Sequence, residues 1–370
     1  MKHLILLVTV VFSFSCSSPS HKKEVADRGD TIATKRITLL FAGDFMQHKE
    51  QIDAAATDNG YDYRDCFSLV KNEVSKADVA IGNLEVTLGG EPYEGYPGFS
   101  APDEYMHAIM DAGFDVMTVA NNHCLDRGSK GLERTIRLLD SLNIPHLGTY
   151  LNIEEREKKY PLIIEKKGFR IALLNYTYAT NGLRVKKPNV VNYIGKNEML
   201  LDIEKARAKN PDFIIACMHW GTEYQSTPDD EQIELANWLF AHGVNHVIGN
   251  HPHVVQPMEL RYDPVKKQKH VLVYSLGNYL SNMSALKTDG GVMFKMELCK
   301  DSTVRVDKCG YSLVWTSRPK HSGEKNYKII PAASPYQELP LRAANRLKIF
   351  VKDSRKLFAT HNKGIEEYVF

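Results

Sequence analysis

The chain has 370 residues, of which 43% are hydrophobic and 25% are charged, a composition typical of a soluble globular protein with one large or two moderate domains. Its 47 basic and 45 acidic residues leave a formal net charge of only +2. This balance provides no strong positive field for gathering nucleic acid, so we expect no nucleic-acid partner, although local basic patches remain open.

The first 35 residues have the layout of a secretion signal followed by a tether. A basic start precedes an apolar run from Leu4 to about Phe14, which is too short to span a bilayer comfortably. We interpret 1–15 as a signal peptide, Cys16 as the lipidated residue of a bacterial lipoprotein, and 16–35 as a polar, lipidated tether. The expected location is the cell envelope, facing the periplasm or exterior. Plain secretion and an uncleaved anchor are the alternatives, because a serine stands three residues before the cysteine, where an aliphatic residue is usual.

From residue 36 onwards, apolar runs of strand length alternate with helical stretches. The expected strands are 36–45, 78–85, 114–123, 144–148, a hairpin at 160–178, 211–221 and 244–253. The expected helices are 62–77, 101–113, 128–143, 196–210 and 229–243. Repeated helix-then-strand units of this length indicate an α/β domain with a mainly parallel sheet.

After Pro257 the pattern changes to two-sided strands, which favours antiparallel β-structure. These strands are 257–262, 269–280, 290–299 and 302–315, and a helix with a basic exposed face is expected at 339–361. We therefore divide the mature chain into a domain over 36–320 and a C-terminal extension with a helix over 321–370.

Five cysteines follow the proposed lipidation site, and an odd, scattered set does not resemble a disulfide framework. We interpret most of them as buried apolar residues. Cys299 and Cys309 bracket a short strand, and whether they pair is left open.

Each expected strand ends in polar groups that could serve as ligands. These are Asp44, Asn83, Glu85, Asn121, Asn122, His123, His219, Asn250, His251, His253 and Asn278. In open α/β sheets, ligands bind beyond the carboxyl ends of the strands, so these residues are expected to converge. Taken singly, each could instead cap a helix or fill a turn.

A mixed set of imidazole, carboxylate and amide groups suits one or two divalent ions such as Mn, Zn, Fe or Mg. The predicted ligands are Asp44, Glu85, Asn122, His219, His251 and His253, with Asn83, Asn121, Asn250 and Asn278 as supporting residues. His251 and His253 flank Pro252, and in an extended segment their side chains would point to the same face. His123 is the predicted proton donor, oriented by Asp126.

Other chemistries find no motif in the chain. There is no G-x-S-x-G elbow, no phosphate-binding GxxxxGK[ST] loop and no G-x-G-x-x-G after a strand. The glycine- and aromatic-rich stretch 89–105 could overhang the site or be a surface connection. Tyr176, Tyr178 and Tyr224 could line the same pocket or belong to the edge of the core.

Six motifs together resemble the bacterial CapA-type poly-γ-glutamate capsule synthesis family, a branch of the calcineurin-like metallophosphoesterase superfamily. They are "LLFAGDFM", "IGNLE", "VANNHCLDRG", "MHWGTEY", "GNHPHVVQP" and "YSLGNY", and they cover roughly residues 36 to 285. The resemblance implies a four-layer α/β/β/α sandwich with two central mixed sheets and metal-binding loops at one edge.

Motif by motif, the resemblance implies a role for several residues. Asp44 matches the first metal-binding aspartate, Asn122 the asparagine ligand and His123 the proton donor. His219 matches the next histidine ligand, and His251 and His253 match the paired histidines of the last motif.

Two departures from the superfamily pattern concern the metal site. Met46 stands where classical members have a histidine, with His48 two residues further on. Asn83 and Glu85 occupy the stretch that usually supplies a bridging aspartate. One ion, or two weakly held ions, is compatible with this set.

Three functions follow from these expectations. The first is a metal-dependent hydrolase of the cell envelope that acts on a phosphoester or on a capsule polymer. The second is a non-catalytic component of a capsule or exopolymer synthesis and export complex, which binds metal or anionic polymer. The third is a binding lipoprotein with a vestigial site. Expected partners are an anionic polymer or phosphoester substrate, other capsule synthesis proteins, and the membrane through the N-terminal lipid.

Overall fold

The computed structural model describes residues 34–265 and 267–370, together with Met1. Thr34–Phe370 form one compact unit. Apart from Met1, the predicted signal peptide lies outside the described residues, as do the lipidation site Cys16 and nearly all of the predicted tether. In the described ranges, no helix is both long enough and apolar enough to cross a membrane.

The first of two large sheets has the strand order β18-β17-β16-β1-β4-β5-β6. Its parallel part consists of β1 (Lys35–Phe45), β4 (Val79–Leu84), β5 (Val116–Thr118) and β6 (His146–Leu147). Its antiparallel part consists of β16 (Gly290–Lys300), β17 (Val304–Ser317) and β18 (Lys328–Pro331). Two short strands, β15 (Asn278–Leu280) and β19 (Glu366–Glu367), pair in parallel with β1 and β17.

The second sheet has the order β13-β14-β12-β11-β9-β8. Its four central strands are parallel: β14 (Gln268–Val273), β12 (His246–Asn250), β11 (Phe213–His219) and β9 (Phe169–Thr177). The edge strands β13 (Met258–Asp263) and β8 (Leu162–Lys166) are antiparallel to their neighbours. The hairpin expected at 160–178 is the pair β8–β9.

The two sheets pack face to face around the main core, and alternation along β1 shows how. Ile37, Leu39 and Phe41 join a buried cluster that includes residues of the second sheet, whereas Leu40 and Ala42 join a second cluster on the opposite face. Successive side chains of a strand point to opposite faces, so β1 separates two apolar layers. Full burial of each such side chain stabilises the fold by roughly 1.5–3 kcal/mol.

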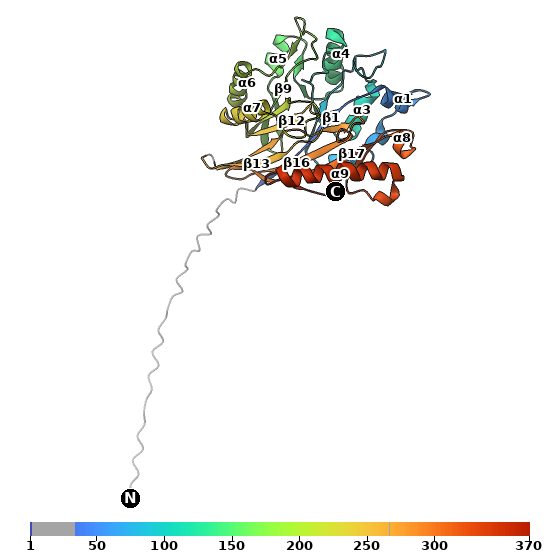
Figure 1. The fold of residues 1–370 in the computed structure, drawn as a ribbon. Helices are drawn as coiled ribbons and strands as arrows, with labels where there is room; N and C mark the ends of the chain where they lie inside the picture. The colour runs from blue at the N-terminus through green and yellow to red at the C-terminus, as the bar shows by residue number, and fades with distance from the viewer. Residues whose placement is uncertain (2–33, 266) are drawn as a thin grey trace. The chain divides into compact units, whose positions relative to one another are not determined.

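Helices form the outer layers of the sandwich (Figure 1). The cluster on the outer face of the first sheet contains residues of α1 (Lys49–Ala55), η1 (Arg64–Phe67), α2 (Lys71–Val74) and α3 (Asp103–Asp111). On the second sheet, α6 (Lys196–Ala208) packs against β11 and α7 (Asp230–Ala241) against β12. The α/β architecture with two central mixed sheets is therefore confirmed. The remaining elements are β2 (Ala56–Thr57), β3 (Gly60–Tyr61), α4 (Gly128–Ser141), β7 (Thr149–Tyr150), α5 (Ile153–Lys159), β10 (Val190–Val191), α8 (Pro319–Ser322), η2 (Tyr336–Glu338) and α9 (Leu341–His361).

The C-terminal helix α9 belongs to the same compact unit as the sheets. Leu347, Phe350 and Phe358 are part of the main core cluster, and the Phe358 ring lies 4.7 Å from that of Tyr311 in β17. Beyond the helix, Lys363 donates its backbone N–H to the carbonyl of Met258 in β13. The C-terminal segment therefore packs into the domain core.

Two expected elements differ in the structure. The helix expected at 62–77 is wrong, because it divides into η1 and α2. Between them the Ser68 hydroxyl donates to the Asp65 carbonyl at 2.9 Å, a local bond that competes with regular helix. The strand expected at 269–280 divides into β14 and β15, because Gly277 (φ 69°) turns the chain from the second sheet to the first.

The antiparallel pattern expected after Pro257 is only partly correct, since β14 runs parallel to β12. Cys299 and Cys309 do not form a disulfide, because the five cysteines in the described part of the chain are free. Cys299 faces Arg305 in the β16–β17 register, and Cys309 faces Met296, so the two thiols occupy different rungs.

Candidate metal centre

Polar side chains from both sheets meet where the parallel strands end. Asp44 lies next to both Asn83 and Asn278 in the register of the first sheet. In the second sheet, His219 at the end of β11 lies next to Asn250 at the end of β12. Because both sheets present the carboxyl ends of these strands at one edge, residues more than two hundred positions apart come together as expected.

Glu85, directly after β4, is the central carboxylate. It is fully buried, and neither carboxylate oxygen has a hydrogen-bond partner among residues 34–265 and 267–370. Its Oε1 lies 3.6 Å from His219 Nε2 and 3.8 Å from His253 Nε2. Burial and the nearby charge of Asp44 raise the pKa of Glu85 well above its ordinary value. A carboxylate enclosed without donors is the environment that a cation would relieve.

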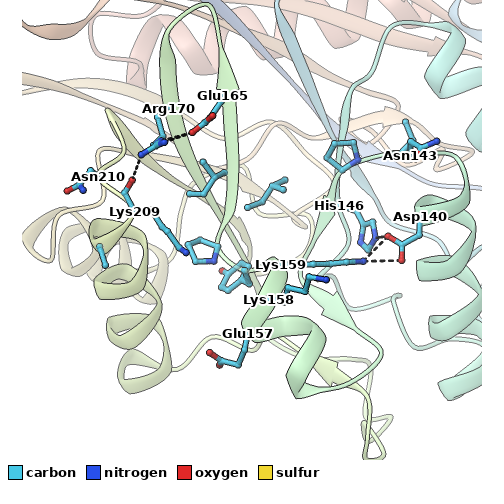
Figure 2. A pocket seen from close by; sticks show the side chains of 17 residues that line it. Asp140, Asn143, His146, Glu157, Lys158, Lys159, Glu165, Arg170, Lys209 and Asn210 are labelled. Carbon is cyan, nitrogen blue, oxygen red and sulfur yellow. Dashed lines mark hydrogen bonds and ion pairs between the residues drawn. The ribbon is translucent and has the colours of Figure 1, made fainter.

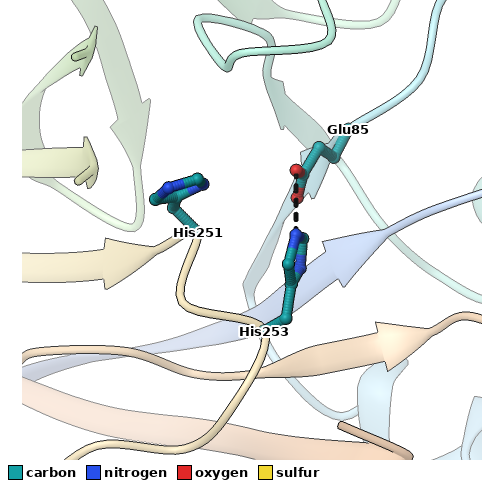
Figure 3. Close-up of side chains that lie close together, drawn as sticks. All are labelled: Glu85, His251 and His253. Carbon is teal, nitrogen blue, oxygen red and sulfur yellow. Dashed lines mark ion pairs between the residues drawn. The ribbon is translucent and has the colours of Figure 1, made fainter. Parts of the chain in front are cut away.

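The histidines complete two overlapping groups of possible ligands. Glu85, His251 and His253 each offer an atom, all within 4.8 Å of one another, and Asp44, Glu85 and His219 do the same. Figure 3 shows the first group, with His253 beneath the Glu85 carboxylate and His251 to one side. The Nδ1 atom of His251 is buried without a partner in the described structure.

Burial keeps two of these imidazoles neutral. It lowers the pKa of His251 to about 3 and that of His219 well below its ordinary value, with the neighbouring histidines adding to both effects. A neutral imidazole is the form that binds a metal.

The backbone of the last motif differs from the expected extended segment. His251 has φ 100° and His253 has φ 59°, so both lie in the left-handed region on either side of Pro252. The two rings nevertheless lie 5.9 Å apart, because the tight turn rather than an alternating strand brings them to one site. Backbone strain of this kind, of order 1–3 kcal/mol per residue, is concentrated at functional sites.

Three of the four supporting asparagines hydrogen-bond within or beside the centre. Asn83 donates Nδ2 to Asp44 Oδ1 at 2.8 Å, and Asn278 Oδ1 lies 3.0 Å from His253 Nδ1. Asn121 bonds to the Leu84 carbonyl and accepts the backbone N–H of His123. The Oδ1 atom of Asn250 is buried without a partner in the described structure.

Asn122 and His123 reach the site from the loop after β5. Asn122 Oδ1 lies 2.8 Å from His219 Nε2, so two of the predicted ligands already touch. His123 Nδ1 lies 2.7 Å from Asp126 Oδ2, which also accepts the backbone N–H of Phe99 at 3.1 Å. The predicted His123–Asp126 contact is therefore present. It sets the imidazole so that Nε2 is the free ring nitrogen.

The centre opens into a cleft of about 950 Å³. The cleft is lined by Met46, His48, Tyr96, Pro97, Gly98, Asn122, His123, Asp126, Asn181, Leu183, Glu223, Tyr224, His253 and Met283. Part of the stretch 89–105 therefore borders the site, which confirms one of the two interpretations given to it. The position of Met46 as a lining residue shows that it faces the cleft without offering a nitrogen ligand.

The three tyrosines divide between cleft and core. The Tyr178 ring lies 4.5 Å from His251, and the Tyr224 ring 6.2 Å from His253. Tyr176 is fully buried and donates its hydroxyl to Asp202, so it belongs to the core. Sequence reasoning missed Asn181 and Glu223. Glu223 lies inside the motif "MHWGTEY" and could have been found there, whereas Asn181 follows no recognisable pattern.

A second cleft, of about 790 Å³, lies away from this edge, beside the starting ends of β6 and β9 (Figure 2). Its charged side chains are largely paired with one another. Lys159 and His146 both contact Asp140, and Arg170 pairs with Glu165. It contributes nothing to the metal centre.

Comparisons with known proteins agree with the motifs. The chain is 28% identical over 287 residues to "Capsule biosynthesis protein CapA" of Bacillus anthracis, which covers 74% of this chain and 66% of that relative, just under two thirds of its length. It is 25% identical over 317 residues to "PGA biosynthesis protein CapA" of Bacillus subtilis (strain 168), which covers 83% of this chain and 79% of the relative.

Two solved structures were also found by comparison of folds. One is the NAD nucleotidase of Haemophilus influenzae, with a TM-score of 0.49 and 12% identity over 91% of this chain and 65% of that one. The other is the calcineurin-like phosphoesterase YfkN of Bacillus subtilis, with a TM-score of 0.48 and 15% identity over 87% of this chain and 98% of that one. The model of the family "Bacterial capsule synthesis protein PGA_cap" matches residues 38–283, and the chain belongs to this family.

Proposed function

We propose that this protein is a metal-dependent hydrolase of the cell envelope, acting on a phosphoester or on a linkage in a capsule or envelope polymer. One observation carries the proposal: the Glu85 carboxylate is buried without hydrogen-bond donors in the described structure, between His219 and His253, and His253 lines an open cleft. Such an arrangement is costly for the fold unless a cation completes it.

The residues present fit a divalent ion. Asp44, Glu85, His219, His251 and His253 would hold it, with Asn122 as a further oxygen ligand. The mixture of nitrogen and oxygen donors suits Mn, Zn or Fe, and Mg to a lesser extent. When bound, the ion makes water a better nucleophile at neutral pH and withdraws electrons from the linkage under attack.

His123 supplies the proton that the leaving group requires. Asp126 accepts the Nδ1 proton of His123, and this leaves Nε2 to carry and release a proton. The Phe99 ring packs 4.6 Å from the imidazole and limits its rotation. A proton donor positioned in this way typically accelerates such reactions by roughly 10²–10⁴-fold.

The proposal is tested by metal analysis and assay of the purified full chain. Wild-type protein is expected to retain a divalent metal and to hydrolyse either a chromogenic phosphodiester or poly-γ-glutamate. The paired change His251→Ala and His253→Ala should remove both properties. A control with two exposed histidines changed, His107→Ala and His361→Ala, should keep them. If the wild type holds no metal and the first pair changes nothing, the hydrolase proposal is wrong.

The alternative is a non-catalytic component of a capsule or exopolymer synthesis complex. It is favoured by Met46, which lines the cleft in place of a histidine, and by Asn83 and Glu85 in place of a bridging aspartate. Metal retention without turnover of any phosphodiester or polymer, combined with co-purification of other capsule synthesis proteins, would favour this second function.

We also propose that the chain is anchored by a lipid on Cys16 in the bacterial cell envelope. The support is the N-terminal sequence, in which an apolar run leads into a cysteine followed by a polar segment. Labelling with palmitate in the bacterial host tests it. Incorporation that disappears in Cys16→Ser is expected, and label that is absent or independent of Cys16 would contradict the anchor.

A further inference from the structure

Three cations lie close together on the loop that follows β9 and borders the metal cleft. They are Arg184, Lys186 and Lys187, within the sequence "NGLRVKKPN", and we refer to them as the basic lip. All three residues are exposed. The loop lines the cleft through Asn181 and Leu183, immediately before the first of the cations.

The start of this loop is tied to the site. Asn122 donates Nδ2 to Asn181 Oδ1 at 3.2 Å, so the first part of the loop is hydrogen-bonded to a predicted metal ligand. A tight turn follows, in which Leu183 donates its backbone N–H to the Thr180 carbonyl and the Thr180 hydroxyl bonds back to the Leu183 carbonyl at 2.6 Å. The position of the basic lip relative to the cleft is therefore set by hydrogen bonds.

The middle and the end of the loop are anchored by packing. Val185 contacts a small apolar cluster formed by Cys124, Leu125, Leu132, Ile136 and Val191. Asn189 donates Nδ2 to the Leu151 carbonyl and to Glu133 Oε1, both at 3.2 Å. With Val185 turned inward, the cations on either side of it are left at the surface.

The cations of the basic lip have no side-chain partners in the described structure. Across the described ranges, the side chains of Arg184, Lys186 and Lys187 form no ion pair or hydrogen bond, whereas Lys159 pairs with Asp140 at 2.8 Å. Exposed cations usually gain little from pairing, so their lack of partners costs the fold little. It leaves their charge available to a ligand.

The interior of the metal cleft has the opposite character. Its lining residues include the carboxylates Asp126 and Glu223 and no lysine or arginine. The basic lip, which follows the lining residue Leu183 in the chain, therefore adds positive charge next to a cleft whose charged lining residues are acidic. The basic lip would hold a multiply charged anion outside the cleft, while a single linkage of that anion enters the cleft between the histidines.

We infer that the basic lip binds an anionic polymer, a chain of repeated carboxylates or phosphates, and feeds one linkage at a time to the metal centre. The three cations are spread over up to roughly 10 Å of extended chain. This spread suits a ligand whose negative charges are repeated along its length better than one small anion. Continuity with the cleft favours a polymer over a membrane surface. The inference rests on the proposed function only for the fate of the linkage, because the binding itself needs no metal.

The test measures binding of poly-L-glutamate, and of polyphosphate of matched length, to the full chain treated with EDTA. The triple variant Arg184→Gln, Lys186→Gln and Lys187→Gln is expected to bind about 10- to 100-fold more weakly. The control Arg342→Gln, Lys352→Gln and Lys356→Gln removes the same charge from the exposed side of α9 and should bind like the wild type. Wild-type affinity should also fall as salt is raised.

Preference between the two polymers identifies carboxylate or phosphate as the recognised group. Equal weakening in both triple variants, unchanged binding in the lip variant, or binding to anionic phosphatidylglycerol vesicles in preference to either polymer would overturn the inference. Because metal is absent, lip-dependent binding in a protein that never hydrolyses the polymer would count against the hydrolase proposal alone.

Discussion

Replacing Glu85 by glutamine gives the sharpest test of the centre, because the substitution keeps the shape of the side chain and removes its charge. In metal-free protein the Glu85 carboxyl is fully buried without hydrogen-bond partners in the described structure, and its pKa lies well above the ordinary value of 4.5. The unfolded chain therefore releases this proton at lower pH than the folded protein does. Above pH 4.5, ionisation in the unfolded chain favours unfolding.

The sign and size of the effect follow from this difference. The stability that the raised pKa contributes is fully present below pH 4.5 and is lost as pH rises towards the folded-state pKa. The loss amounts to about 1.4 kcal/mol for each pH unit in that window. Glutamine cannot ionise. Metal-free Glu85→Gln should match metal-free wild type near pH 4.5 and become progressively more stable than it at higher pH.

Denaturant unfolding in EDTA at several pH values measures this gap, and the same titration with Mn²⁺ or Zn²⁺ measures the effect of the ion. The wild type should gain about 2.7 kcal/mol at a free metal concentration of 100 Kd, and Glu85→Gln should gain far less. Glu73→Gln is the matched control. Its buried carboxylate accepts from Lys76 and Lys295, so the change should lower stability at neutral pH.

Two results would refute the reasoning. One is metal-free Glu85→Gln that is no more stable than wild type at pH 8. The other is a metal-induced gain that survives the substitution. Either result would mean that the Glu85 carboxylate is not part of a preformed cation-binding site.

Three further predictions concern the proton donor, the histidines and the last helix. Asp126→Asn should lower turnover by roughly 10²–10⁴-fold with unchanged metal content, because His123 loses its orienting acceptor; equal turnover in steady-state assays would contradict this. The His251 contribution to the stability of metal-free wild type should be lost as pH falls below 6.5, because the unfolded chain protonates His251 while burial holds its folded pKa at about 3; in EDTA, the stability of wild type relative to His251→Ala should therefore decrease as pH falls. Phe350→Ala should lower the free energy of unfolding by about 3–5 kcal/mol, since its ring is 2% exposed, and a change below 1 kcal/mol would mean that α9 is not part of the core.

Much of the candidate site could be predicted because its residues follow strands with strong apolar patterns. Asp44, His219 and His251 each follow such a run, and parallel strands bring their carboxyl ends to one edge. Asn181 and Glu223 could not be placed in this way. They lie on loops whose course depends on hydrogen bonds and packing formed only in the folded chain.

The expected fold failed where tertiary contacts outweighed local pattern. The apolar run 269–280 predicts one strand. In the structure, the turn at Gly277 places the end of this run in the first sheet, where Asn278 lies beside Asp44. The helix expected at 62–77 breaks, but its apolar residues Phe67, Val70 and Val74 still enter the core. In both places the spacing of the apolar residues is compatible with more than one course of the backbone, so the sequence pattern does not show where the element breaks.

The sequence by itself determined the class of fold, the family and the residues that could hold a metal, because strand periodicity and the chemistry of side chains are local properties. Only the tertiary structure decided that Glu85 has no hydrogen-bond partner among the described residues, that a left-handed turn joins His251 to His253, and that the loop carrying the basic lip lines the cleft through Asn181 and Leu183. The burial of a side chain, its hydrogen-bond partners and its neighbours depend on segments far apart in the chain, and no pattern within one segment specifies them.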